Sequence, residues 1–254
     1  MTDTLTASEE RPSVLDYDAI LLDIGNVIIY DFPVELAYSF FVSREIISMG
    51  LDLEVTANEI LFASRSPEGF IEKLGSEELW NQLNSIAWNQ VLENWALLSI
   101  PIPGAIEAIK YLSHKPLAIV ANQPCETMKV LERFDIDRFV DVIILDSMIG
   151  VSKPDLAIYR HASERLGRPL ESSIMIGDRL DNDIFPAKAL GLATAWIRDF
   201  PLDKELPVPL VTEEWKRHYY RGKDNIVVQP LEFQKNGLDT GPDYILGRLA
   251  DLLI

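Results

Sequence analysis

The chain has 254 residues, 48% of them hydrophobic, which is enough for one large domain or for a core domain with a smaller insert. Its formal net charge of -17 excludes a nucleic-acid partner, because a phosphate backbone would be repelled. The single Cys125 excludes an internal disulfide framework, and no apolar run reaches the roughly 18 residues of a membrane helix. We therefore expect a soluble, cytoplasmic protein with no nucleic-acid or membrane partner.

Residues 1–15 are polar and acidic, and we predict a disordered tail there. Beyond them the chain contains five short apolar runs, most of them rich in β-branched residues and most followed by a polar or glycine-containing turn. Such runs are typical of strands that are buried on both faces of a parallel sheet. They cover residues 18–23, 116–121, 141–146, 173–177 and 193–198.

Helical patterns alternate with four of these runs, because apolar side chains recur there at spacings of three and four. They cover residues 103–113, 126–134, 155–166 and 183–190. The alternation predicts an α/β fold with a doubly wound, Rossmann-like parallel sheet. In such sheets a ligand binds beyond the carboxyl ends of the strands, so the polar residues at those ends are the candidate site.

Two stretches interrupt the alternation. Residues 32–98 are helix-like throughout, and we predict a small all-helical insert that covers the carboxyl edge of the sheet. Residues 199–241 are rich in proline, and we predict an irregular insert whose one cationic and aromatic cluster lies at 215–221. Residues 242–254 are expected to form a short closing helix. The predicted core therefore comprises residues 16–31 and 99–254.

Three predicted strand ends carry charged side chains that could act together in one site. Asp23 follows the first strand, Lys153 follows the third, and Asp178 follows the fourth, with further carboxylates just beyond it. Carboxylates without a histidine cluster favour a hard cation such as Mg²⁺. A neighbouring ammonium keeps a carboxylate ionised, and an ionised carboxylate beside a metal can act as a nucleophile.

The segments 18–29, 116–123, 150–159 and 174–198 resemble, in order, the four motifs of the haloacid dehalogenase-like (HAD) superfamily. Residues 32–98 resemble the helical, C1-type cap that this family inserts after its first motif. The resemblance covers roughly residues 16–198 and 242–254. The Lys153 segment together with the stretch GDRLDNDIFPAKALG is fairly specific, whereas short apolar strands that end in Asp are common.

The resemblance implies a role for each matching residue. Asp23 would be the nucleophile that forms an aspartyl-phosphate, and Lys153 would steady Asp23 and the transferring group. Mg²⁺ would be held by Asp23, Asp178 and the backbone carbonyl of Gly25, with Asp183 supporting the metal shell. The implied activity is Mg²⁺-dependent hydrolysis of small phosphate monoesters. The oligomeric state is left open.

Two positions depart from the family pattern. The family's phosphatases usually carry a second Asp, a general acid and base, where this chain has Gly25, although some members resemble it in having Asp-x-Gly-Asn-Val. The family also places Ser or Thr, a phosphoryl-oxygen ligand, where this chain has Ala121. The amide groups of Asn122 and Gln123 are candidates to replace that hydroxyl, and Asn26 is a further candidate for contact with the substrate.

These departures keep two other functions open. One is a metal-free 2-haloacid dehalogenase-like hydrolase, a subfamily that also lacks the second Asp but has Tyr at the position of Gly25. The other is a non-catalytic binding protein on the same fold, for which the 199–241 insert would be the partner surface. Residues 32–98 contain three Lys or Arg residues and no His, which favours a small, partly apolar substrate over a polyphosphate.

Overall fold

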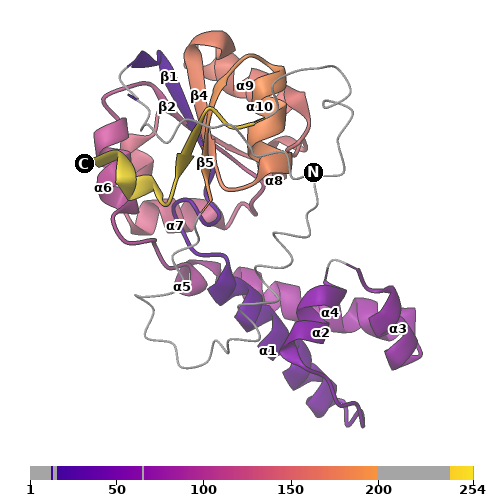
Figure 1. Cartoon of the computed structure of the whole chain (residues 1–254). Coiled ribbons are helices and arrows are strands. Elements are labelled where there is room, and N and C mark those ends of the chain that lie inside the picture. Colours follow the sequence, from indigo (N-terminus) through magenta and orange to yellow (C-terminus); the bar gives the residue numbers. More distant parts are fainter. Residues whose placement is uncertain (1–12, 14–15, 65, 199–240, 254) are drawn as a thin grey trace. The chain divides into compact units, whose positions relative to one another are not determined.

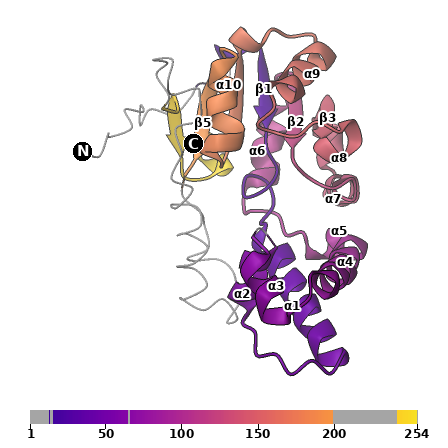
Figure 2. The same ribbon diagram turned by 90° about the vertical axis from the view of Figure 1, so that its right-hand side faces the viewer.

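The computed structural model describes residues 13, 16–64, 66–198 and 241–253, which divide into two compact units (Figures 1 and 2). The sheet unit contains the described residues up to Tyr30 together with 101–198 and 241–253, and the helical unit contains the described residues of 31–100. Apart from Ser13 and Gly241, the predicted tail at 1–15 and the predicted insert at 199–241 lie outside the described residues.

The sheet unit is built on six parallel strands in the order β3-β2-β1-β4-β5-β6. These strands are β1 (Ala19–Leu22), β2 (Leu117–Ala121), β3 (Val142–Leu145), β4 (Ser173–Gly177), β5 (Ala193–Ile197) and β6 (Tyr244–Leu246). The predicted parallel α/β fold is confirmed. The first strand lies inside the sheet, where β2 and β4 pair with it on its two sides, so its carboxyl end is flanked by two other strand ends.

Helices cover both faces of this sheet (Figure 1). They are α6 (Ala105–Leu112), α7 (Thr127–Arg133), α8 (Asp146–Ile149), α9 (Leu156–Leu166) and α10 (Phe185–Ala189). The described part of the unit also contains four other helical turns: the 3₁₀ helices Ile136–Phe139, Leu170–Ser172 and Leu249–Leu253, and the π-helical turn Leu180–Ile184. Ile158 and Ala187, from α9 and α10, pack with Leu21, Val120 and Met175 into one hydrophobic core, and α6 lies on the opposite face.

The predicted closing helix at 242–254 is wrong in its first half. Residues Tyr244–Leu246 form β6, and only Leu249–Leu253 are helical, as a 3₁₀ turn. Without β6 the backbone of β5 would be an unpaired edge, and Asp243 helps to hold the added strand there. Its carboxylate accepts hydrogen bonds from the backbone N–H and hydroxyl of Thr194, at 2.8 and 2.9 Å, and lies 2.8 Å from the ammonium of Lys188.

The helical unit contains α1 (Phe32–Ser48), α2 (Ala57–Ala63), α3 (Glu68–Leu74), α4 (Glu77–Glu93) and α5 (Trp95–Leu98). Two of these helices begin at side-chain caps: Thr56 and Glu59 form a capping box at α2, and the hydroxyl of Ser76 caps α4. Tyr38 of α1 donates a 2.6 Å hydrogen bond to Asn84 of α4. None of the helices in the described ranges is long and apolar enough to cross a membrane. The covering role expected of residues 32–98 stays a prediction.

Candidate active site

The sheet unit holds Asp23 at the carboxyl end of its first strand. All four residues of β1 are buried, and the backbone N–H of Asp23 still donates to the carbonyl of Ile176 on β4, at 3.0 Å. Asp23 is therefore held as part of the ladder and cannot move independently of the sheet. It is 7% exposed, so its carboxylate lies at the sheet edge but largely out of water.

The chain turns back sharply just after Asp23. The carbonyl of Ile24 accepts hydrogen bonds from the backbone N–H groups of Val27, Ile28 and Ile29 at 2.8 to 3.2 Å, and these residues are fully buried or nearly so. Asn26 has a left-handed backbone with φ of 53°, which Asn tolerates better than most residues. This conformation brings its side-chain amide to 3.4 Å from the Asp178 carboxylate, to which it donates.

Lys153 places one ammonium between two carboxylates. Its Nζ lies 2.7 Å from Oδ1 of Asp23 and 2.6 Å from Oδ1 of Asp183, and all three side chains are buried. Burial by itself lowers the pKa of Lys153, but the attraction of Asp183 and Asp23 is larger and raises the pKa overall. The lysine is therefore a fixed positive charge beside Asp23.

The side chain of Asn122 forms two hydrogen bonds with the backbone of Lys153. Its Nδ2 donates to the carbonyl of Lys153 and its Oδ1 accepts from the N–H of Lys153, both at 2.8 Å. Asn122 directly follows β2, so the two hydrogen bonds tie the Lys153 loop to the strand beside β1. This contact gives Asn122 a positioning role that the sequence did not suggest, and its predicted contact with substrate stays a prediction.

Gln123 is fixed by its backbone rather than by its side chain. Its N–H donates to Asp146 and its carbonyl accepts from the hydroxyl of Ser147, both at 2.8 Å. Its side-chain Oε1 is buried and has no hydrogen-bond partner within the described part of the chain. The predicted contact of the Gln123 side chain with substrate stays a prediction.

Asp178 and Asp183 come from the end of β4 and the π-helical turn that follows it. A Cβ at Gly177 would overlap the carboxyl group of Asp183, so only glycine lets this turn fold back onto the strand. Oδ2 of Asp183 accepts from the backbone N–H of Arg179 at 3.0 Å, and the hydroxyl of Tyr159 donates to the carbonyl of Asn182. The turn is therefore fixed from both sides, and Asp183 is fully buried.

Three carboxylates converge in this arrangement. Asp23, Asp178 and Asp183 each offer one oxygen, and these oxygens lie within 4.8 Å of one another. Burial raises the pKa of Asp23, and it raises that of Asp183 to about 7, although Lys153 opposes both shifts. A set of hard oxygen donors with excess negative charge fits Mg²⁺ or a similar divalent cation. The metal role expected of the Gly25 carbonyl stays a prediction.

The structure thus brings together Asp23, Lys153, Asp178 and Asp183, with Asn26 beside Asp178. The sequence interpretation missed two supporting residues, Gly177 and Tyr159. A glycine directly before Asp178 was a usable signal for a close backbone approach. Tyr159 gave none, because it looks like one more apolar position on the buried face of α9.

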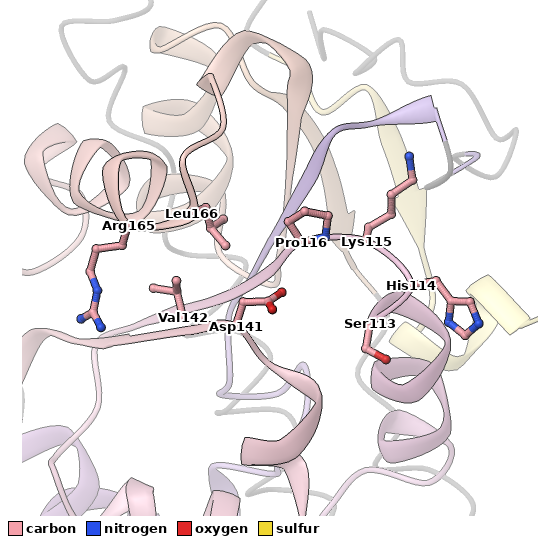
Figure 3. Close-up of a pocket in the computed structure, with 8 residues that line it drawn as sticks. All are labelled: Ser113, His114, Lys115, Pro116, Asp141, Val142, Arg165 and Leu166. Atoms are coloured by element: carbon pink, nitrogen blue, oxygen red, sulfur yellow. The ribbon is translucent and has the colours of Figure 1, made fainter.

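A separate pocket of about 330 Å³ lies at the opposite edge of the sheet (Figure 3). It is lined by residues 113–116, which precede β2, by Asp141 and Val142 at the start of β3, and by Arg165 and Leu166 of α9. The side chains of Lys115 and Arg165 extend in different directions in Figure 3. None of the predicted site residues lines this pocket, so the candidate site stays at the carboxyl edge.

Known proteins share both the sequence motifs and the fold. A family model for haloacid dehalogenase-like hydrolases matches residues 17–191. The chain is 29% identical over 133 residues to pyrimidine 5'-nucleotidase YjjG of Escherichia coli, which covers 51% of this chain and 56% of that protein. It is 39% identical over 157 residues to pyrophosphatase PpaX of Halalkalibacterium halodurans, covering 60% and 58%.

A solved structure of a predicted phosphoglycolate phosphatase from Haemophilus somnus shares the fold, with a TM-score of 0.65 at 16% identity. That match covers 94% of this chain and 97% of the other. The chain spans about half the length of the curated relatives that it matches. Because the family model covers more than half of the chain, and the sheet carries the family's motifs at one edge, the chain belongs to the haloacid dehalogenase-like hydrolases.

Proposed function

We propose that this protein is a Mg²⁺-dependent hydrolase of small phosphate monoesters that works through an aspartyl-phosphate on Asp23. The observation that carries the proposal is the buried Asp23 carboxylate, 2.7 Å from Lys153 and within a cluster of three carboxylates. Two of the relatives that the chain resembles are named as a nucleotidase and a pyrophosphatase, and both names describe hydrolysis at phosphorus.

The charges around Asp23 fit such a reaction. Lys153 favours the ionised form of Asp23 and opposes the effect of burial on its pKa, and the ionised form offers a carboxylate oxygen to attack phosphorus. Asp23, Asp178 and Asp183 would hold the cation together with the carbonyl of Gly25. When bound, Mg²⁺ supplies positive charge that offsets both the carboxylates and the phosphoryl oxygens. The side chains of Gln123 and Asn26 are the amide groups that we assign to substrate contact.

The test is phosphate release from 4-nitrophenyl phosphate and a panel of small phosphate esters, measured during a Mg²⁺ titration. We expect activity that saturates with Mg²⁺, disappears in EDTA, and falls by about 10³-fold or more in Asp23→Asn. Asp181→Asn is the matched control, because Asp181 pairs with Arg179 at the surface and lies outside the three-carboxylate cluster. It should stay close to the parent.

Other results would favour the competing functions. An Asp23→Asn variant as active as the parent would refute the proposed nucleophile. Full turnover of a 2-haloacid in EDTA would identify a metal-free dehalogenase. No turnover of any phosphate ester or haloacid by folded protein would support a binding protein that has kept the fold.

A further inference from the structure

We infer that this site acts on phosphate compounds whose leaving group departs without receiving a proton from the enzyme: phosphoanhydrides, acyl and enol phosphates, and aryl phosphates of acidic phenols such as 4-nitrophenol. This inference rests on the proposed function and narrows its substrate class. It begins from Gly25, which is buried two residues beyond the nucleophile and has no side chain to transfer a proton. An activated substrate makes that proton unnecessary, whereas a simple alkyl phosphate needs it.

Three other side chains near Asp23 are also poor proton donors for the leaving group. The ammonium of Lys153 is held between two carboxylates, at 2.7 and 2.6 Å. The hydroxyl of Tyr159 already donates to the carbonyl of Asn182. Asn26 is the neighbour of Gly25, and its amide can donate a hydrogen bond but does not give up a proton.

The three carboxylates form the expected metal set, and in that role they act as ligands rather than as acids. None of these groups of the sheet unit therefore has a proton that it can readily give to the leaving group. General acid catalysis is worth about 10²–10⁴-fold, so its loss falls mainly on substrates with a basic leaving group.

The chemistry then runs in two steps. An oxygen of Asp23 forms a bond to phosphorus while the bond from phosphorus to the leaving oxygen breaks, and that oxygen keeps the electron pair and departs as an anion. Water then attacks the phosphorus, the bond between phosphorus and Asp23 breaks, and the carboxylate is regenerated as inorganic phosphate leaves with the proton going to solvent. Because residue 25 also provides no base for the water, we expect the second step to be slow.

The first experiment measures kcat/KM for a series of aryl phosphates from 4-nitrophenyl to phenyl phosphate, with one alkyl phosphate added. This quantity reports the first step, even where the second step limits turnover. The parent should lose activity steeply as the leaving group becomes more basic. A flat dependence in an enzyme that still needs Asp23 would overturn the inference, because it would require a proton donor from elsewhere, for instance the helical unit.

Gly25→Asp and Gly25→Asn form a matched pair. Gly25 is not among the left-handed glycines of the described chain, so the angle φ at this position does not itself exclude a side chain. We expect Gly25→Asp to raise kcat/KM for phenyl and alkyl phosphates about 10²-fold or more relative to kcat/KM for 4-nitrophenyl phosphate, so that the dependence on the leaving group becomes shallower. Gly25→Asn has nearly the same size as Gly25→Asp but no proton that it can transfer, and it should keep the steep dependence of the parent. An equal gain in both variants would contradict the inference.

A second measurement does not depend on any substitution at residue 25. Rapid mixing of the parent with 4-nitrophenyl phosphate should release about one equivalent of nitrophenolate before a slower steady state, with phosphate trapped on Asp23 after an acid quench. A linear time course without trapped phosphate would contradict the slow second step. The proposed function itself would fail in a different way. In that case the protein would hydrolyse no phosphate ester, or the Asp23→Asn variant would be as active as the parent.

Discussion

The two units place their lysines and carboxylates in opposite environments. In the sheet unit, the side chain of Lys153 is 2% exposed and contacts two carboxylates that are themselves buried. In the helical unit, Lys73 pairs with Glu59 at 2.8 Å, but these side chains are 36% and 43% exposed. Water screens the second pair and not the first, so similar distances between charges correspond to very different energies. The buried charges are the ones that the proposed chemistry uses.

The helical unit instead exposes apolar surface. Phe40, Ile47 and Phe62 are 61 to 76% exposed on α1 and α2, and the short helix α2 begins at a capping box. The sheet unit thus concentrates ionic groups in its interior, which costs stability, while the helical unit is held by local signals and by packing between its helices. Three experiments turn this contrast into measurements.

The largest effect on the free energy of unfolding should come from Lys153→Met, and the same substitution at Lys73 serves as its comparison. Lys153→Met leaves the carboxylates of Asp23 and Asp183 buried without their partner, and we expect a loss of about 3–5 kcal/mol in the free energy of unfolding. Lys73→Met removes an exposed pair and should cost about 0–1 kcal/mol. Urea unfolding of both variants gives the comparison. Equal losses would mean that the Lys153 cluster is as well solvated as the surface pair.

The next largest effect is the pH dependence of the metal-free protein in EDTA. Burial raises the pKa of Asp183 to about 7, so between about pH 4 and pH 7 the folded state binds a proton that the unfolded state has released. The stability due to that proton is therefore complete below about pH 4 and is lost as the pH rises through 7. At about 1.4 kcal/mol per pKa unit, the unfolding free energy should fall by a few kcal/mol over this interval.

Asp183→Asn is the control for this titration, because its amide does not ionise. The fall in stability between pH 4 and pH 7 should shrink in that variant. Saturating Mg²⁺ should also reduce the fall in the parent, since the cation binds the ionised carboxylates and competes with the proton. A parent whose stability rises over this interval in EDTA would contradict the assigned direction.

The smallest effect concerns the start of α2. The hydroxyl of Thr56 accepts from the backbone N–H of Glu59 at 3.2 Å, and the carboxylate of Glu59 accepts from the N–H of Thr56 at 2.7 Å. Thr56→Ala should lower the free energy of unfolding by about 1 kcal/mol, and Thr56→Ser, which keeps the hydroxyl, by less. Thermal unfolding followed by circular dichroism is the measurement. No difference between the two variants would show that this cap contributes nothing.

Local signals explain what could be predicted from the sequence. Five of the six strands in the described chain were expected, because each is a short, mostly apolar run and most of these runs are followed by a turn. Asp23, Lys153 and Asp178 were expected to meet because parallel strands bring their carboxyl ends to one edge, and this needs no knowledge of individual contacts. Their catalytic and metal roles remain proposals.

Features that depend on distant partners were not predictable in this way. The run Tyr244–Leu246 is too short to be distinguished from a helix by its pattern, and its strand pairing depends on β5, about fifty residues earlier. The hydrogen bonds between Asn122 and Lys153 join residues 31 positions apart, and the hydrogen bond from Tyr159 to Asn182 joins residues 23 positions apart. The spacing of residues within one segment contains no information on such pairs.

The direction of β6 sets a lower limit on how far the chain before it can be shortened. It runs parallel to β5, with Ile197 opposite Leu246, so the chain leaves one strand at its carboxyl end and enters the next at its amino end. A parallel connection requires a crossover of about a dozen residues or more. A tight hairpin in place of residues 199–240 would therefore reverse the edge strand and separate Asp243 from Thr194, whereas a spacer longer than this limit is compatible with the whole sheet.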